Sequence, residues 1–339
     1  MTTLDKRPLI RRRMALAQAL RDALGHLGYE EVETPLLVRA PGMEPPIQAF
    51  STAFVPELGD VPGRPLWLHT SPEFAMKRLV ADGWERPFQL VKVFRNGEVS
   101  PTHNPEFTLL ELYRANADYE VLMDDVEQVV RQSARALGQG DALEWDGHPV
   151  DLASPFDRVT VRDAMLSETG LDLRQLEEAE ALRDAARRAG FHVPGAPASW
   201  DDVFFAVFLS AVEPKLGRER PAFLIDYPAR LAALARVKPD DPAVAERFEL
   251  YAAGLELANG FSELTDPVEQ RRRFEREQDE RRAAGREVYP LDEVFLEALG
   301  RMPPAAGVAV GVDRLAMLFT GAQSIDEVLL FPANEEWRR

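Results

Sequence analysis

The chain has 339 residues, of which 45% are hydrophobic and 29% are charged. These values are typical of a globular protein with a substantial core, and the lack of cysteine excludes disulfides, thiolate metal sites and a cysteine nucleophile. The 57 acidic residues against 40 basic ones give a formal charge of −17, which disfavours broad binding to nucleic acid or to an anionic membrane. No segment resembles a signal peptide or a bilayer span, so we expect a cytoplasmic protein.

Apolar residues recur at helical spacing over residues 6–27, and Arg11–Arg13 fall on the opposite, solvated face. This pattern predicts a long amphipathic helix that Gly28 ends. Residues 29–37 are predicted to form a strand, and Pro35 restricts it to an edge or an interface. Residues 38–65 are rich in proline and glycine and are predicted to be a loop with little regular structure.

A second helix is predicted to follow Ser71, which suits the N-cap, with Pro72 in the first helical position and Gly83 at the end. Glu73 lies in its first turn, where a carboxylate either complements the helix dipole or has a functional role.

The segment FRNGEVSPTHNPEFTLLELY, residues 94–113, predicts an antiparallel hairpin, because two apolar runs flank a turn-rich loop. Strand periodicity places Phe107, Glu111 and Tyr113 on one face, and Arg95 continues the same kind of face on the preceding strand. Buried charges are costly without partners. Either Arg95 and Glu111 form a structural ion pair or they line a ligand pocket.

The rest of the chain predicts an alternation of helices and strands, with a largely helical insertion at about residues 138–200. The helices are expected from Asp118 to about Leu137, Trp200–Val212 with Ser199 as its cap, Asp266 to Gly285 as a solvated charged helix, Asp292–Leu299, and Val312 to Gly321. The strands are expected at Ala222–Tyr227, at Ala306–Val310, as a sharply turned pair within residues 246–264, and at Val328–Phe331 after a capping box that begins at Ser324.

Arg314 is predicted to lie in the first turn of a helix, where the dipole disfavours a cation unless an anion is bound there. Two arginines, several glutamates and an aromatic residue suit a magnesium nucleotide and an amine-bearing substrate. The sequence has neither GxxxxGK[ST] nor a strand-linked GxGxxG, which disfavours P-loop and Rossmann nucleotide sites. Its five histidines show no metal-binding spacing.

These segments resemble the class II aminoacyl-tRNA synthetases, in particular the catalytic domain of lysyl-tRNA synthetase. The first helix with GYEEVETPLL is similar to motif 1, the hairpin to motif 2, GVAVGVDRLAMLF to motif 3, and ELANGFSEL to the acidic segment of the lysine subclass. The resemblance implies an α+β fold with an antiparallel sheet flanked by helices. It also implies one catalytic domain over residues 1–339, and a homodimer formed through motif 1.

The family implies ATP and Mg²⁺ as cofactors. By resemblance, Arg95 would contact the α-phosphate, Phe107 would stack on adenine, and Arg314 would bind the γ-phosphate, so that the two arginines are the catalytic residues. Glu249 and Glu256 would hold Mg²⁺. The remaining residues expected to bind ATP are Asn96, Gly97, Asn104, Leu257 and Gly311.

The resemblance also implies a site for an amino acid with two amino groups. Glu73 would bind the amino group near the carboxylate, whereas Glu263 and Tyr113 would bind the distal ammonium. Glu111 would belong to the same acidic wall. The remaining substrate-binding residues implied by the family are Ser71, Pro72 and Ala309.

Three departures from lysyl-tRNA synthetase distinguish this sequence. Motif 1 begins within the first ten residues, so we expect no OB-fold anticodon domain. Ala309 stands where the synthetase motif 3 has glycine, and this resembles truncated paralogues that attach (R)-β-lysine to a lysine of elongation factor P. A packing alanine in a strand is the alternative. Gly97 stands where motif 2 normally has glutamate, which leaves its backbone to contact adenine.

We therefore expect a ligase that activates β-lysine or lysine as an adenylate and transfers it to elongation factor P, without tRNA or a membrane. One alternative is a minimal lysyl-tRNA synthetase-like enzyme, which the acidic charge and the missing anticodon domain disfavour. Another is an inactive paralogue with a regulatory role, and the retained motif arginines and glutamates disfavour that.

Overall fold

The computed structural model describes residues 3–56 and 63–337. The chain divides into two compact units: unit 1 comprises Met1–Gly138 with Ser262–Arg339, and unit 2 comprises Gln139–Phe261. Residues 57–62, part of the predicted loop, lie outside the described residues.

The sheet of unit 1 has the strand order β1-β5-β6-β13. These strands are β1 (Glu30–Glu31), β5 (Pro87–Phe94), β6 (Glu106–Ala115) and β13 (Ala305–Gly311). The predicted hairpin is confirmed, because β5 and β6 pair antiparallel with Val93 opposite Phe107 and Gln89 opposite Glu111. In the next ladder, also antiparallel, Ala309 lies opposite Glu111 and Gly307 opposite Tyr113. One face of three neighbouring strands therefore places the polar residues of motif 2 beside the small residues Gly307 and Ala309 of motif 3.

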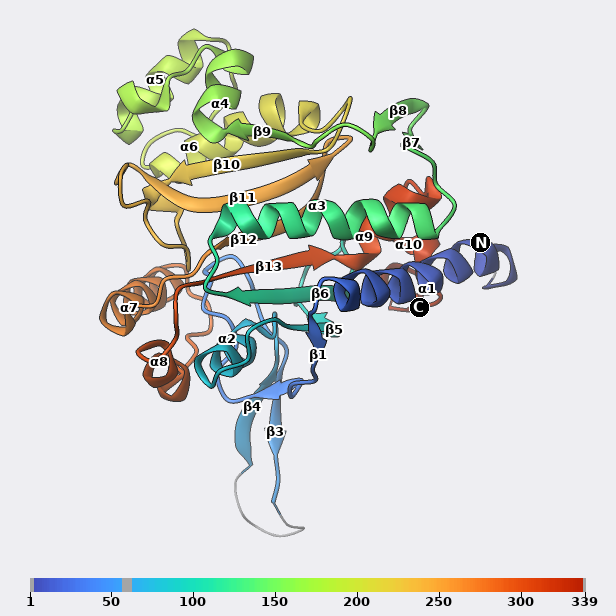
Figure 1. The fold of residues 1–339 in the computed structure, drawn as a ribbon. Coiled ribbons are helices and arrows are strands. Elements are labelled where there is room, and N and C mark those ends of the chain that lie inside the picture. Colours follow the sequence, from blue (N-terminus) through green and yellow to red (C-terminus); the bar gives the residue numbers. More distant parts are fainter. Residues whose placement is uncertain (1–2, 57–62, 338–339) are drawn as a thin grey trace. The chain divides into compact units, whose positions relative to one another are not determined.

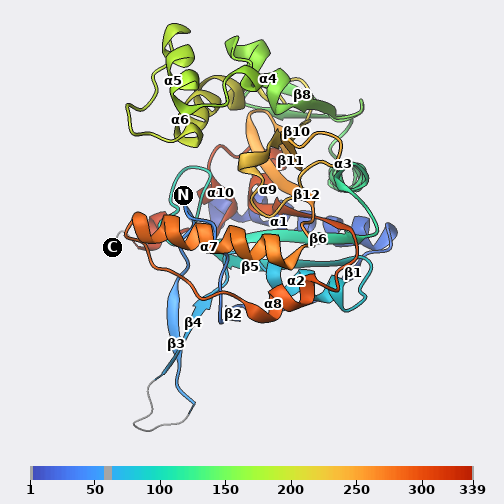
Figure 2. The same ribbon diagram turned by 90° about the vertical axis from the view of Figure 1, so that its left-hand side faces the viewer.

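Helices pack around this sheet, as Figures 1 and 2 show, so the α+β fold predicted from the sequence is confirmed. The helices of unit 1 are α1 (Thr3–His26), α2 (Glu73–Ala81), α3 (Tyr119–Ala136), α7 (Pro267–Ala283), α8 (Glu293–Leu299), α9 (Val312–Thr320), α10 (Ile325–Val328) and α11 (Ala333–Glu336). Helix α1 packs against α3 and α9, whereas α2 packs against α8 and the strands of the hairpin. Asp118 caps α3, as predicted, by accepting hydrogen bonds from the backbone N–H groups of Glu120 and Val121.

The predicted strand at 29–37 and the predicted loop at 38–65 are both wrong in detail. Pairing stops at Glu31, and the chain resumes as β2 (Leu37–Val38), because Pro35 between the two pieces cannot donate to a ladder. Strands β3 (Ser51–Phe54) and β4 (Arg64–Leu68) join β2 in a second sheet with the order β2-β4-β3. Figure 1 shows β3 and β4 projecting from the rest of unit 1.

Three further expectations need correction. The capping box at Ser324 is present, but it starts the short helix α10, so no strand forms at Val328–Phe331. Helix α7 is not simply a solvated face: Arg281 is fully buried and donates hydrogen bonds to loop carbonyls, including those of Glu44 and Ile47. The N-cap of α2 is Pro72 rather than Ser71.

Unit 2 has the strand order β12-β11-β10-β9, with β9 and β10 parallel. Its strands are β7 (Ala142–Trp145), β8 (His148–Asp151), β9 (Asp157–Thr160), β10 (Ala222–Pro228), β11 (Val244–Ala252) and β12 (Leu255–Ser262). Its helices are α4 (Val161–Thr169), α5 (Ala179–Arg188) and α6 (Trp200–Val207). Short helical turns are η1 (Leu173–Gln175), η2 (Phe208–Val212), η3 (Glu213–Lys215) and η4 (Ala229–Leu231). The turned pair predicted within 246–264 is confirmed. Stacked rings of Trp200, Phe204 and Phe208 lie in the core of this unit.

Candidate active site

Two buried glutamates and one half-buried glutamate converge in unit 1 from distant parts of the sequence. Glu111 lies on β6 and Glu263 directly follows β12, and both are 2% exposed. Glu73 begins α2. Glu111 accepts hydrogen bonds from Ser71 Oγ at 2.8 Å and from the Tyr113 hydroxyl at 2.7 Å. The structure thus brings together the residues that were predicted to bind the amino groups of a substrate.

A lysine that the sequence analysis missed lies within this cluster. Lys77 Nζ is 2.5 Å from Glu73 Oε1 and 2.6 Å from Glu263 Oε2, and the side chain is 1% exposed. Its position one turn after Glu73 on α2 is an ordinary i,i+4 spacing, so the sequence offered a local signal for the first pair only. Because Glu263 is 186 positions further along the chain, only the fold shows the second pair.

Burial perturbs the ionisation of the cluster. Desolvation, followed by the charge of Glu73, raises the pKa of Glu111 to about 8, although Tyr113, Ser71 and Lys77 oppose the shift. Desolvation likewise raises the pKa of Glu263, and Lys77 opposes that shift. The pKa of Lys77 is also raised, because attraction to Glu263 and Glu73 outweighs its own burial. The cluster is thus short of positive charge at neutral pH, and an ammonium ligand would supply it.

The other end of this sheet face has the features of a nucleotide site. The guanidinium of Arg95 lies 5.2 Å from the centre of the Phe107 ring, and it forms a long ion pair, 4.0 Å, with Glu98. Glu111 has other partners, as described above. The two residues are therefore not explained by a structural Arg95–Glu111 ion pair, and the ligand-pocket interpretation remains.

Gly97 adopts φ of +88°, a left-handed conformation that favours glycine. The order Gly97-Glu98, which departs from motif 2, therefore places glycine at the position that needs it and brings the Glu98 carboxylate toward Arg95. The backbone N–H of Asn96 donates to the carbonyl of Gln48, so the start of this loop is anchored.

Arg314 lies in the first turn of α9, as predicted. Its Nη2 is 2.6 Å from His103 Nε2, which can accept this hydrogen bond only when the histidine is neutral. Burial, reinforced by the charge of Arg314, lowers the pKa of His103 and so favours that neutral form. His103, which we had not assigned a role, therefore helps to orient Arg314.

Two residues near this site have structural partners. The side chain of Asn104 donates to the carbonyl of Glu106 and accepts from the backbone N–H of Ala333, which favours a structural role over the predicted contact with adenine. Asp313 is 2% exposed and accepts hydrogen bonds from Arg13 at 2.6 Å and from the Thr108 backbone at 2.7 Å. Arg13 therefore links motif 1 to motifs 2 and 3, and it does not lie on a solvated face as predicted.

Unit 2 holds the two predicted magnesium ligands. The carboxylate of Glu249 accepts hydrogen bonds from Arg247 Nη2 at 2.7 Å and from the Tyr251 hydroxyl at 2.6 Å. Glu256 lies opposite Tyr251 in the β11–β12 ladder, and Leu257 beside it is buried. Across the described residues, no group of three or more acidic, histidine or cysteine side chains could hold a metal. Two carboxylates nevertheless fit Mg²⁺, which commonly takes one or two from the protein and its other ligands from phosphates and water.

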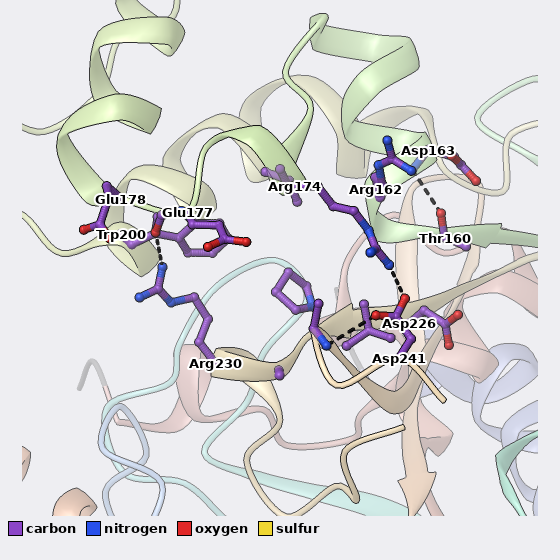
Figure 3. Close-up of a pocket in the computed structure, with 15 residues that line it drawn as sticks. Thr160, Arg162, Asp163, Arg174, Glu177, Glu178, Trp200, Asp226, Arg230 and Asp241 are labelled. Carbon is purple, nitrogen blue, oxygen red and sulfur yellow. Dashed lines mark hydrogen bonds and ion pairs between the residues drawn. The ribbon is translucent and has the colours of Figure 1, made fainter. Parts of the chain in front are cut away.

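Unit 2 also has a separate pocket of about 550 Å³, shown in Figure 3. None of the predicted site residues lines it. Its arginines already have acidic or carbonyl partners: Arg162 pairs with Asp172, Arg174 with Asp241, and Arg230 donates to the Glu177 carbonyl while lying over Trp200. Within the part of the chain that the structure describes, no helix has both the length and the apolar character needed to cross a membrane.

The mainly antiparallel sheet, the motif 2 hairpin on it and the arginine at the start of α9 define a class II aminoacyl-tRNA synthetase core. The family described as "tRNA synthetases class II (D, K and N)" matches residues 2–335, and the chain belongs to it. Within that family it is related to lysyl-tRNA synthetase.

Two relatives illustrate this relation. The chain is 39% identical over 323 residues to the lysine–tRNA ligase of Pelotomaculum thermopropionicum, covering 94% of this chain and 62% of that protein. It is 40% identical over 322 residues to the lysine–tRNA ligase of Moorella thermoacetica, covering 94% and 64%. The chain thus spans less than two thirds of the length of these relatives.

Proposed function

We propose that this chain activates a diamino acid, β-lysine or lysine, as an aminoacyl-adenylate and transfers it to a lysine of elongation factor P. The observation on which this depends is the cluster of Glu73, Glu111 and Glu263, which lies on the same sheet face as Arg95 and Phe107. Three carboxylates, one of whose charges Lys77 balances, leave a formal charge of two negative when all are ionised. This charge matches two ammonium groups, whereas a single ammonium group would leave part of it unbalanced.

The proposed chemistry has two steps. First, an oxygen of the substrate carboxylate attacks the α-phosphorus of ATP, and pyrophosphate leaves. Then the neutral ε-amine of the acceptor lysine attacks the carbonyl carbon of the adenylate, an amide forms, AMP leaves, and the amine proton passes to solvent. The protein needs no covalent nucleophile, because its contribution is to position two anions and to neutralise their charge.

Named side chains would supply this positioning. Arg95 would bind the α-phosphate and Arg314, oriented by His103, the γ-phosphate, while Phe107 would stack on adenine. The glutamate cluster would hold the amino groups and so aim the carboxylate at the α-phosphorus. Mg²⁺ held by Glu249 and Glu256 would neutralise phosphate charge.

Ala309 supports β-lysine as the substrate. It is partly exposed and lies opposite Glu111 in the β6–β13 ladder, so its methyl group is on the same face as the carboxylate cluster. A single methyl changes discrimination between related substrates by about 1–3 kcal/mol. It can therefore favour one lysine isomer without excluding the other.

The test combines the purified chain with ATP, Mg²⁺, (R)-β-lysine and elongation factor P, followed by intact-mass analysis of the factor. The expected result is a gain of one β-lysyl group. If the adenylate forms, as shown by substrate-dependent ATP–pyrophosphate exchange, but the factor gains no mass, the acceptor assignment is wrong.

A second candidate is lysylation of tRNA, which the similarity to lysine–tRNA ligases favours. Transfer of radiolabelled lysine to tRNA would support it, whereas the acidic charge of −17 favours a protein acceptor. If exchange fails with every lysine isomer, the chain is an inactive paralogue.

We further propose that the chain acts in the cytoplasm as a homodimer formed through α1 and β2. Leu4 and Met14 on α1 are 73% and 64% exposed, and Leu37 on β2 is 50% exposed, so these segments present apolar surface to solvent. Light scattering is expected to give twice the chain mass of 38.0 kDa.

A further inference from the structure

Lys77 differs from the predicted substrate ligands because it brings a positive charge into a site for positively charged groups. It binds Glu73 and Glu263 together, and its Nζ lies 5.9 Å from the centre of the Phe295 ring. Burying an ammonium here is costly, and its two carboxylate partners offset that cost. Such a group needs an explanation beyond packing.

A count of the formal charges in the cluster supplies an explanation for Lys77. When Lys77 and the carboxylates of Glu73, Glu111 and Glu263 are all ionised, the cluster has a formal charge of two negative. Lysine and β-lysine each have two ammonium groups, while their carboxylate is directed to the phosphates under the proposed function. The cluster with Lys77 therefore balances one bound diamino acid, whereas the same cluster without Lys77 would keep one unbalanced negative charge.

The geometry agrees with this count. Lys77 Nζ forms an ion pair with Oε2 of Glu263, and neither oxygen of this buried carboxylate has a hydrogen-bond partner of good geometry among residues 3–56 and 63–337. A Cβ at Gly307 would come within 2.5 Å of this Oε1 and 2.3 Å of Tyr113 Cε1. Glycine at this position therefore lets the Tyr113 ring and the Glu263 carboxylate pack directly against the β13 backbone. A buried carboxylate without a good donor is a group that an ammonium ligand would satisfy.

We infer that Lys77 is a positioning and specificity-determining residue, which holds Glu73 and Glu263 in place and sets the charge of the pocket to match two ammonium groups. This inference rests on the proposed function, since it concerns the amino acid that is activated. It assigns Lys77 no contact with the reacting atoms. The charged and titratable groups that surround it and its partners are Glu44, Glu73, Arg95, Glu111, Tyr113 and Glu263.

The test is Lys77→Met, assayed by ATP–pyrophosphate exchange with L-lysine and with (R)-β-lysine. At pH 7 we expect KM for the amino acid to rise at least about tenfold while KM for ATP stays within about twofold, since one pKa unit corresponds to a factor of ten. Lys77 lowers the pKa values of Glu111 and Glu263. Without it these pKa values rise further, so ionising the two carboxylates at pH 7 costs more, and raising the pH to about 9 is expected to recover part of the loss.

Lys6→Met is the matched control. Lys6 is also 1% exposed and bound to one carboxylate, Glu335, at 2.9 Å, but it lies outside the glutamate cluster. We expect this variant to lose stability in a similar way without a selective change in KM for the amino acid or a recovery at high pH. An unchanged amino-acid KM in Lys77→Met, or the same pH profile in both variants, would overturn the inference.

A second variant covers the case in which Lys77→Met does not fold. The double variant Lys77→Met with Glu263→Gln leaves no unpaired charge between these positions and keeps the formal charge at two negative. Its amino-acid KM is expected to be closer to wild type than that of Glu263→Gln alone, and a higher KM would contradict the charge count. If wild type shows no exchange with either isomer, the proposed function itself fails, which separates the two failures.

Discussion

Binding of a diamino acid to this chain should release protons, and Glu111 provides the means to measure this. Its carboxyl group is 2% exposed, and burial raises its pKa to about 8. At pH 7 the group is therefore about nine-tenths protonated in the free protein. An ammonium ligand needs the ionised carboxylate, so binding must expel this proton.

The free-energy cost of expelling this proton follows from the raised pKa of Glu111. Ionising Glu111 at pH 7 takes about 1.4 kcal/mol, which weakens binding about tenfold relative to a pH well above 8. Affinity should therefore rise between pH 6 and 8 and level off above that range. The same shift makes the folded state bind more protons than the unfolded state between pH 4.5 and 8, so this group's contribution to stability is lost as the pH rises through that window.

The assay is titration calorimetry of lysine binding at pH 7 in two buffers of different ionisation enthalpy. Wild type is expected to release about 0.9 of a proton from Glu111, in addition to the contribution of Glu263. Glu111→Gln should bind more weakly and release about 0.9 of a proton less. Glu31→Gln, which removes an exposed carboxylate paired with Arg21, serves as the control and should match wild type. Equal proton release in wild type and Glu111→Gln would refute the reasoning.

Three further outcomes can be measured. Arg314→Ala should lower ATP–pyrophosphate exchange about 10²- to 10³-fold, as expected for one lost preorganised donor. Its circular dichroism spectrum should be unchanged, and near-normal exchange would show that Arg314 does not belong to the site. Asp118→Ala should lower the free energy of unfolding by about 1 kcal/mol in urea titration, because two capping bonds are lost, whereas Asp118→Asn should stay close to wild type. Gly307→Ala should cost about 1–3 kcal/mol of stability and raise the amino-acid KM, since the added Cβ meets Tyr113 and Glu263. Wild-type values of both would show that the close packing of these side chains on Gly307 does not matter for substrate binding.

The sequence was sufficient wherever a local rule decides the structure. Period-two alternation predicted that Phe107, Glu111 and Tyr113 share a face, and the pairing of β6 with both neighbours confirms it. The cap at Asp118 and the helix that contains Arg314 were also predicted, because a capping residue and a glycine end mark helix boundaries.

Local rules were not sufficient for the strand at 29–37 and the loop at 38–65. Strands β2, β3 and β4 are short, β3 is exposed throughout and β4 buries only Trp67, so none shows the alternation that marks a half-buried strand. Their pairing depends on one another and not on a pattern within each segment. The strand expected at Val328–Phe331 was wrong because the capping box at Ser324 starts a short helix that includes Val328, and residues 329–331 follow it without joining a sheet.

The amino-acid sequence by itself determined the α+β core, the hairpin and the residue types that suit ATP and a diamino acid. The tertiary structure alone decided which partners balance the charges of those residues. Lys77 neutralises part of the charge on Glu73 and Glu263, and Asp313 joins Arg13 across 300 positions of sequence. The physical reason is that a buried charge must find its partner in space, and the partner's place in the sequence follows from the fold and not from any local periodicity.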